Sequence, residues 1–303
     1  MQNRTTFSRR EFLASTSLVL SAASLPGSLL GAQAVTGYRL GCYTRPWDQW
    51  DYRVALDGIA EAGFKYAGLM TAKAKSWVII TVDSTVEEVQ TIAREAKQRG
   101  LQILSIYGGD FPVSQSVEVG IAGLRKLIDF CGLCSCPNLL LGGTTDEKLF
   151  EPYYKVVAEC CDYAQSKKVG LSIKHHGGQN ATGPQCRKII DRLGRKEFRL
   201  WYDPGNIFYY SDGKLDPVED SRTVDGLVVG MSVKDFLPPK EVLVTPGTGK
   251  VDFRAVMNRL GQGGFHSGPL LVECLAKCDT PAAVTQEAIK ARKFLHGLLD
   301  SMG

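Results

Sequence analysis

The stretch Leu200-Trp201-Tyr202-Asp203-Pro204-Gly205-Asn206 decides the fold, because an apolar, strand-like run ends there on an acid that is followed by turn residues. An Asp at the tip of a buried strand is poorly solvated unless it holds a cation, a proton or a ligand. We therefore expect Asp203 to belong to a chemical site at the end of a buried strand.

Apolar runs of the same kind recur along the chain and alternate with longer segments of helical period. The predicted strands are Arg39–Tyr43, Tyr66–Met70, Gln102–Tyr107, Asn138–Leu141, Gly170–Lys174, Phe198–Tyr202, Leu227–Val233 and Leu270–Glu273. The helical period is clearest at Val86–Arg99, Val119–Cys134, Glu151–Lys168 and Pro281–Leu299. Eight such units predict an α/β fold, a single-domain (β/α)8 TIM barrel. A doubly wound open sheet would use the same alternation, but no Gly-x-Gly-x-x-Gly follows the first strand.

The N-terminus is typical of an export signal and is set aside from the fold. Ser8-Arg9-Arg10-Glu11-Phe12-Leu13 precedes an apolar run over Ala14–Leu30, and Ala32-Gln33-Ala34 is a small-x-small cleavage site. We expect residues 1–34 to be a twin-arginine signal peptide and residues 35–303 the barrel domain, located in a bacterial periplasm. Five serines, a proline and a glycine interrupt the apolar run. No stable membrane insertion is expected once the signal is removed.

Charge and cysteine content exclude other classes of function. The formal net charge is only +4, and the basic residues are interspersed with acids, so we expect no nucleic-acid partner. Of the nine cysteines, Cys131-x-x-Cys134-x-Cys136 could suggest a metal knuckle, but no second Cys-x-x-Cys completes four ligands. Buried thiols are the favoured interpretation and a disulfide the alternative.

Polar residues follow most of the predicted strands, where a parallel barrel builds its active site. They are Thr44-Arg45, Gly108-Gly109-Asp110, Lys174-His175-His176, Asp203, Lys234-Asp235 and Glu273. Strand alternation places Lys174 and His176 on the inward side and His175 on the outward side. Trp47, which follows the first strand with Arg45, could stack on a sugar ring or only cap the barrel end.

Several of these patterns, in this order, resemble the xylose-isomerase-like barrel superfamily of sugar isomerases and epimerases. The resemblance runs from about Tyr38 to the C-terminus. It rests on Val169–Gly178, Asp203-Pro-Gly-Asn206, Ser232-Val-Lys-Asp235, Gly247-Thr-Gly-Lys-Val-Asp252 and Leu270-Leu-Val-Glu273.

The resemblance implies a divalent metal ion, which metal-dependent members hold with a Glu, an Asp, a His and a Glu on strands five to eight. Asp203 and Glu273 match two of these ligands, whereas Lys174 stands in place of the first Glu and Ser232 in place of the His. His176 would supply a third ligand, and a site of His176, Asp203 and Glu273 would suit Mn²⁺, Zn²⁺, Fe²⁺, Co²⁺ or Mg²⁺.

The chemistry implied is proton abstraction next to a sugar carbonyl. With a metal, Glu273 is a ligand and a candidate base; without one, Lys174 and Lys234 would polarise the carbonyl. Lys174 could instead form an inert ion pair with either acid, and Lys234 with Asp235. The predicted substrate-binding residues are Arg45, Trp47, His175, Asn206 and Asp235.

The sequence thus predicts an exported enzyme that isomerises or epimerises a small sugar or keto-sugar. Loss of the fifth-strand Glu makes a lyase, hydratase or hydrolase of 3-keto-glycosides the first alternative. A non-catalytic sugar-binding barrel is the second. A zinc-dependent DNA-repair nuclease of the same barrel type needs many histidines, and the chain has four.

Overall fold

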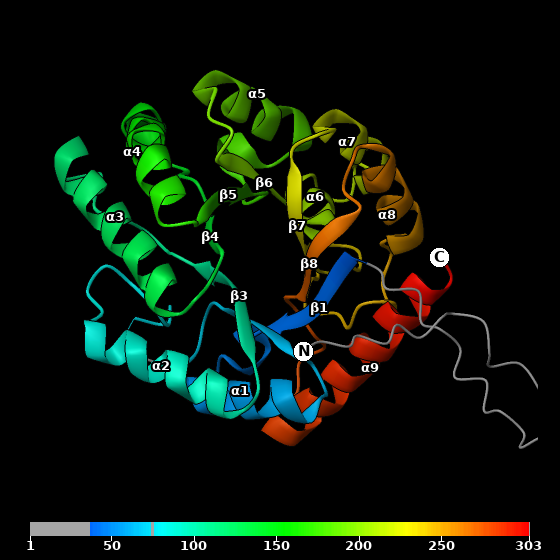
Figure 1. Ribbon diagram of the computed structural model, residues 1–303. Helices are drawn as coiled ribbons and strands as arrows, with labels where there is room; N and C mark the ends of the chain where they lie inside the picture. The colour runs from blue at the N-terminus through cyan, green and yellow to red at the C-terminus, as the bar shows by residue number, and fades with distance from the viewer. Residues whose placement is uncertain (1–36, 74–75, 303) are drawn as a thin grey trace, which may run out of the picture. The chain divides into compact units, whose positions relative to one another are not determined.

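The computed structural model of the protein describes residues 37–73 and 76–302. The predicted signal peptide, residues 1–34, lies outside them. Eight parallel strands form a closed barrel in sequence order, with β8 pairing with β1 (Figure 1). The strands are β1 (Gly37–Tyr43), β2 (Tyr66–Leu69), β3 (Gln102–Tyr107), β4 (Asn138–Leu141), β5 (Gly170–Lys174), β6 (Phe198–Tyr202), β7 (Val228–Val233) and β8 (Ser267–Val272). The predicted (β/α)8 barrel is confirmed.

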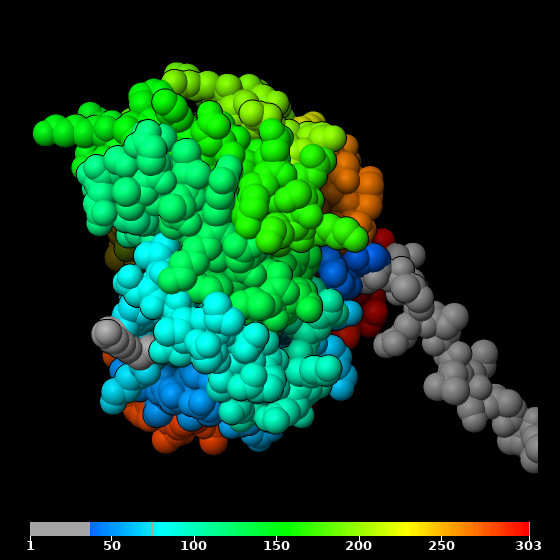
Figure 2. Space-filling model, turned by 60° about the vertical axis from the view of Figure 1, so that its left-hand side comes forward, coloured from blue at the N-terminus to red at the C-terminus, as the bar shows by residue number. Residues whose placement is uncertain are grey.

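Helices surround the barrel and cover the apolar outer face of the sheet (Figure 1). They are α1 (Tyr52–Glu61), α2 (Val86–Gln98), α3 (Val117–Leu133), α4 (Glu147–Ser166), α5 (Gly183–Leu193), α6 (Pro204–Tyr210), α7 (Pro217–Ser221), α8 (Phe253–Gln262) and α9 (Pro281–Asp300). Three single 3-10 turns are η1 (Arg45–Trp47), η2 (Gly178–Asn180) and η3 (Arg222–Val224). Figure 2 shows a face of the molecule that is formed mainly by the cyan and green parts of the chain.

Side-chain oxygens at the helix N-termini explain why most helices begin where they do. Asp51, Thr85, Ser116 and Asp146 each accept a hydrogen bond from a backbone N–H in the first turn of α1 to α4. This contact satisfies one of the donors that a helix start leaves unpaired. Such caps place each helix start beside the carboxyl end of the preceding strand, which keeps the connecting loops at one end of the barrel.

Large side chains fill the inside of the barrel, so that it is a packed core and not a channel. Tyr43, Met70, Leu104, Leu140, Trp201 and Leu271 form this inner cluster. Gly68 and Gly230 make room for the two largest rings, because a Cβ at either position would overlap the ring of Tyr43 or Trp201. The inner cluster therefore forms a floor beneath the carboxyl ends of the strands.

The cysteines are packing residues. All nine lie within the described residues, all nine are free thiols, and all but Cys278 are buried. Burial raises the pKa of the Cys131 and Cys134 thiols, which keeps them protonated.

In the described residues no helix is long and apolar enough to cross a membrane.

Candidate active site at the carboxyl ends of the strands

Asp203, the acid that ends β6, is the first residue of the site and also begins α6. Its Oδ1 accepts a hydrogen bond from the backbone N–H of Asn206 at 3.0 Å, and Pro204 occupies the first helical position. The turn thus fixes one carboxylate oxygen as a helix cap and leaves Oδ2 to face the barrel axis. Asp203 is completely buried, so this second oxygen needs a charged partner.

Two lysines supply that partner. Lys174, the last residue of β5, places its Nζ 2.9 Å from Asp203 Oδ2, and Lys234, directly after β7, places its Nζ 3.1 Å from the same oxygen. Both Nζ atoms also lie 2.6 Å from the carboxylate of Glu273, directly after β8. We call Lys174, Asp203, Lys234 and Glu273 the buried quartet. No member is more than 2% exposed.

Glu273 has no oxygen lone pair to spare. Its Oε1 contacts Lys234 and accepts a hydrogen bond of 2.9 Å from Arg45, while Oε2 accepts hydrogen bonds from Lys174 and from the Ser232 hydroxyl at 2.6 and 2.5 Å. A carboxylate offers about four acceptor sites; three hydrogen bonds and the ion pair with Lys234 therefore leave Glu273 little capacity for a further partner. Burial alone would raise the pKa of Glu273, but Lys174, Lys234 and Arg45 hold it well below its ordinary value. Glu273 is therefore a fixed anion, and this arrangement argues against its predicted role as base.

The two lysines differ in what they have left to offer a ligand. An ammonium group has three N–H donors. Lys234 donates a hydrogen bond to Asn206 Oδ1 at 3.0 Å and forms ion pairs with Asp203 and Glu273, so it has three partners. Burial alone would lower the pKa of Lys234, but Asp203 and Glu273 outweigh it and the pKa is raised. Among the described residues Lys174 has two partners, because it donates a hydrogen bond to Glu273 Oε2 and forms an ion pair with Asp203 Oδ2, so at least one of its N–H donors remains.

The predicted metal ligands do not assemble. Among the described residues no group of three or more His, Cys, Asp and Glu side chains is placed to hold a metal ion. Lys174 Nζ lies between the Asp203 and Glu273 oxygens that would coordinate one, and Ser232 uses its hydroxyl on Glu273 and accepts from Trp201 Nε1 at 3.2 Å. The two carboxylates thus already hold the ammonium group of Lys174 between them. This set of donors does not fit a divalent cation.

Above the buried quartet, the barrel mouth carries a rim of Arg45, Tyr107, His176 and Tyr210. The His176 ring lies 6.3 Å from the ring of Tyr107 and 6.2 Å from the ring of Tyr210. Gly142 leaves space for two of these groups, because a Cβ there would lie 2.7 Å from the Tyr107 hydroxyl and 3.4 Å from His176 Nδ1. The rim residues are only partly buried or exposed, so a small molecule can reach them.

His176 is the rim residue suited to accept a proton. Its side chain is exposed at the mouth, but protein atoms enclose it on most sides. This burial, together with the ammonium groups of Lys174 and Lys234, lowers its pKa to about 4. The imidazole is consequently neutral at physiological pH and keeps a free lone pair. His176, predicted as a metal ligand, stands instead as a candidate general base.

Four predicted substrate-binding residues are buried parts of the scaffold. Trp47 is completely buried against Gly58, and its Nε1 donates to the Pro281 carbonyl, so it caps the barrel end. His175 points outward, as alternation predicts, and its Nδ1 accepts from the backbone N–H of Asp203. Neither of them faces the mouth.

Asn206 and Asp235 hold backbone in place. The Asn206 amide donates to the His175 carbonyl and accepts from Lys234, which leaves little for a ligand. Asp235 accepts from the backbone N–H groups of Phe236, Gly247, Gly249 and Val251, and thereby anchors the glycine loop after β7. Of the five predicted substrate-binding residues, only Arg45 reaches the mouth.

Tyr107, Tyr210 and Asn180 were not singled out in the sequence analysis. Tyr107 is the last residue of a predicted strand, and only the polar residues after it were taken as site candidates. Asn180 lies in the turn after β5, where it is buried and donates to the carbonyls of Gly142 and Lys174, which ties two loops of the mouth together. The Gly177-Gly178 pair just before Asn180 is the sequence feature that could have indicated this tight turn.

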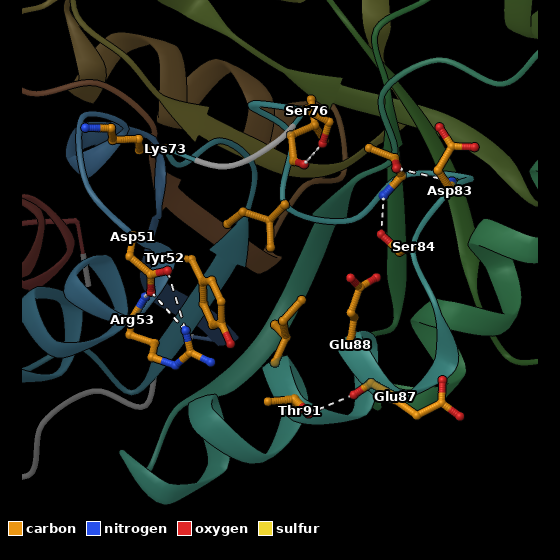
Figure 3. Close-up of a pocket in the computed structure, with 14 residues that line it drawn as sticks. Asp51, Tyr52, Arg53, Lys73, Ser76, Asp83, Ser84, Glu87, Glu88 and Thr91 are labelled. Atoms are coloured by element: carbon orange, nitrogen blue, oxygen red, sulfur yellow. Dashed lines mark hydrogen bonds and ion pairs between the residues drawn. The ribbon is translucent and has the colours of Figure 1, made fainter.

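A second hollow lies outside the barrel, between the starts of α1 and α2 (Figure 3). It has a volume of about 720 Å³. Some of its charged groups serve the helices: Arg53 pairs with Asp51 and Glu95, and Glu88 completes the capping box of α2 with Thr85. The other charged side chains of the lining, Lys73, Asp83 and Glu87, are exposed to water, so the buried quartet and its rim remain the stronger site.

Comparison with known proteins agrees with the architecture. A family model described as xylose isomerase-like TIM barrel matches residues 56–295. A xylose isomerase domain protein from Planctomyces limnophilus superposes with a TM-score of 0.63 at 20% identity, covering 80% of this chain and 91% of that one. D-Psicose 3-epimerase from Clostridium cellulolyticum H10, solved with D-tagatose, superposes with a TM-score of 0.67 at 13% identity, covering 86% and 99%. At these identities the likeness shows the fold alone.

A curated sequence relative is also similar to part of the chain. The probable L-ribulose-5-phosphate 3-epimerase of Mycoplasma pneumoniae is 27% identical over 109 residues, which is 36% of this chain. The match spans about a third, 34%, of that relative's length.

Proposed function

Since this chain belongs to the xylose isomerase-like TIM barrel family, we propose that it is an enzyme that moves a proton next to the carbonyl group of a small sugar or keto-sugar. Ammonium and guanidinium groups of the protein stabilise the resulting enolate in this proposal. The similarity to sugar epimerases supports the general kind of reaction. The finer assignment rests on the residues at the barrel mouth.

One observation carries the proposal: at the barrel mouth, positive charge in excess of negative charge lies close to a neutral imidazole. Lys174, Lys234 and Arg45 face only two carboxylates, Asp203 and Glu273, so the cluster has a net charge of about +1 at neutral pH. Burying the four charges of the quartet is costly unless they do something that apolar packing cannot. A fixed positive field is worth most where negative charge develops during a reaction.

The proton transfer follows from these roles. His176 takes the proton from the carbon next to the carbonyl, and the electron pair of the broken C–H bond moves onto the carbonyl oxygen. The remaining N–H donor of Lys174 holds that oxygen as its negative charge grows, and the nearby guanidinium of Arg45 adds positive charge to the site. The proton of the neighbouring hydroxyl then passes to the enolate oxygen, that hydroxyl becomes the new carbonyl, and His176 returns its proton to the former carbonyl carbon, which gives the isomerised sugar.

A single free base favours isomerisation over a two-base epimerisation. Glu273 is saturated by its four contacts, and Lys234 keeps its proton because its pKa is raised. Elimination or hydrolysis of a 3-keto-glycoside begins with the same proton removal, and it remains the second candidate because it also needs only one base.

The test is exchange of substrate hydrogen for deuterium. Protein treated with EDTA is incubated in D₂O with a panel of ketoses, aldoses and 3-keto-glycosides, and NMR follows deuterium at the carbon next to the carbonyl. We expect exchange that needs no added metal, is absent in His176→Gln and is retained in His296→Gln, because His296 is exposed on α9. A change of product skeleton would select the eliminating activity. Saturable binding of these sugars with no exchange would overturn the proposal and favour a sugar-binding barrel.

We also propose that the protein is exported by the twin-arginine route and acts in the periplasm. The support is in the sequence alone, in Arg9-Arg10 and the Ala32-Gln33-Ala34 cleavage site. Cell fractionation and N-terminal sequencing test it. A mature chain starting at Val35 in the periplasmic fraction is expected, and retention of the full chain in the cytoplasm, unchanged by Arg9→Lys with Arg10→Lys, would contradict it.

A further inference from the structure

We infer that the substrate itself carries an anionic group, a carboxylate or a phosphate, and that Arg45 binds it. This inference rests on the proposed function and names the substrate class of the same site. It follows from where the excess charge of the site lies and from how few donors of Arg45 the protein uses.

The excess positive charge lies on Arg45. Within the buried quartet, two ammonium groups face two carboxylates, so the quartet is neutral as a whole. Arg45 is the additional cation. Its side chain is 28% exposed, whereas Lys174 and Lys234 are 2% exposed. The charge that is not balanced inside the protein is therefore also the one that an incoming molecule meets first.

Most donors of Arg45 are unused by the described residues. A guanidinium group has five N–H donors, and Arg45 makes one side-chain hydrogen bond, from Nη1 to Glu273 Oε1. Glu273 holds the group in place from below, so the other edge of the fork is presented at the mouth. A fixed guanidinium edge matches the paired oxygens of a carboxylate or phosphate, to which it can donate two parallel hydrogen bonds.

The rest of the rim is compatible with an anion. Burial raises the pKa of Tyr107 to about 12, and burial also raises the pKa of Tyr210, so both phenols stay protonated and can donate. His176 is neutral. The acid nearest to Tyr107 is Asp110, which is exposed to water, where screening weakens its repulsion of an anion.

Titration calorimetry on the full barrel domain tests the inference without requiring turnover. The anionic probes are D-gluconate and D-glucuronate for the carboxylate and D-fructose 6-phosphate for the phosphate, and the neutral probes are D-glucose and D-fructose. We expect at least one anionic probe to bind about tenfold or more tightly than its neutral counterpart, with an affinity that falls as salt rises. The preferred probe then tells a carboxylate substrate from a phosphorylated one.

Variants locate the effect. Arg45→Gln should remove the preference for the anionic probe, and Arg45→Lys should retain part of it, because it keeps the charge but not the fork. The matched control is Arg53→Gln, which removes an exposed arginine from the hollow of Figure 3 and should leave the preference unchanged. Equal affinity for neutral and anionic probes, or a preference that survives Arg45→Gln, would overturn the inference.

The two proposals fail in distinguishable ways. Anion binding at Arg45 without any deuterium exchange would refute the proposed reaction and leave the inference standing. Deuterium exchange on neutral sugars, with no anionic probe bound more tightly than its neutral counterpart, would do the reverse.

Discussion

The two halves of the barrel mouth contrast in charge. Among the described residues, every buried Lys, Asp or Glu comes from β5 or later: Lys174, Asp203, Asp220, Lys234, Asp235 and Glu273. In the half formed by β1 to β4, Thr44, Met70 and Tyr107 stand at the strand ends, and Arg45 lies at the rim. The second half thus holds the buried ion pairs and the candidate base of the site, and the first half supplies Arg45, the cation that is not balanced inside the protein.

The contrast explains why the quartet is stable although it is buried. Each charge there has partners of opposite sign within about 3 Å, so removing one member leaves the others unbalanced in a poorly solvated place. Ion pairs on the outer helices, such as Glu151 with Arg192, are exposed and stand in water. Pairs of that kind contribute little.

Glu273→Gln is the strongest way to break this contrast. It removes the anion that Lys174, Lys234 and Arg45 share, so we expect a loss of about 3–5 kcal/mol in the free energy of unfolding, measured by urea denaturation, together with loss of activity. The matched control is Glu151→Gln on α4, which should leave the unfolding curve unchanged. An equal change in the free energy of unfolding for the two substitutions would mean that the quartet stabilises the protein no more than an exposed ion pair does.

His176→Ala removes the candidate base and leaves the four charges of the buried quartet in place. The side chain is exposed at the mouth, so the melting temperature should stay close to that of the wild type, while kcat falls by about 10² to 10⁴. His296→Ala is the control for loss of an exposed histidine. A wild-type kcat in the His176→Ala variant would mean that His176 is not the general base.

The pH dependence of kcat/KM sharpens the same point. The pKa of His176 is lowered to about 4 by burial and by Lys174 and Lys234, so the neutral, reactive form is present above that pH and is lost below it. We expect the acidic limb near pH 4, well below the ordinary histidine value of about 6.5. In Lys234→Met one cause of the lowering is gone, and the limb should move to higher pH. A limb near pH 6.5 in the wild type would contradict the arrangement.

Ser232→Ala gives the smallest effect. It deletes one hydrogen bond to the Glu273 carboxylate and one from Trp201 Nε1, while the three cations around Glu273 remain. We expect a loss of about 1.5–3 kcal/mol in the free energy of unfolding with activity largely retained. Complete loss of activity in a folded variant would show that this hydroxyl contacts the substrate.

The fold could be predicted from the sequence because the period of apolar residues records it directly. The predicted bounds of β3, β4, β5 and β6 match the structure, and the other strands differ by at most three residues at an end. Lys174, Asp203, Lys234 and Glu273 were placed correctly at the mouth, since strand ends of a parallel barrel converge.

The roles of these residues could not be predicted in the same way. Whether Lys174 leaves room for a cation depends on the distance between its Nζ and two carboxylates that are far apart in the sequence. Whether Asp235 faces a ligand or a loop depends on where Gly247 and Gly249 bring their N–H groups. The role of Trp47 could not be predicted either, because a Trp that stacks on a sugar and a Trp that caps a barrel end have the same sequence pattern.

The central claim is that Lys174 occupies the place between Asp203 and Glu273 that a divalent cation would need. Calorimetric titration of Mn²⁺ and Zn²⁺ into chelator-treated protein tests it most directly, with Lys174→Glu and Lys174→Met alongside the wild type. We predict no binding at this site in the wild type and about one equivalent of metal in Lys174→Glu, while Lys174→Met shows whether removing the ammonium is sufficient. One equivalent bound by the wild type and lost in Asp203→Asn would contradict the account.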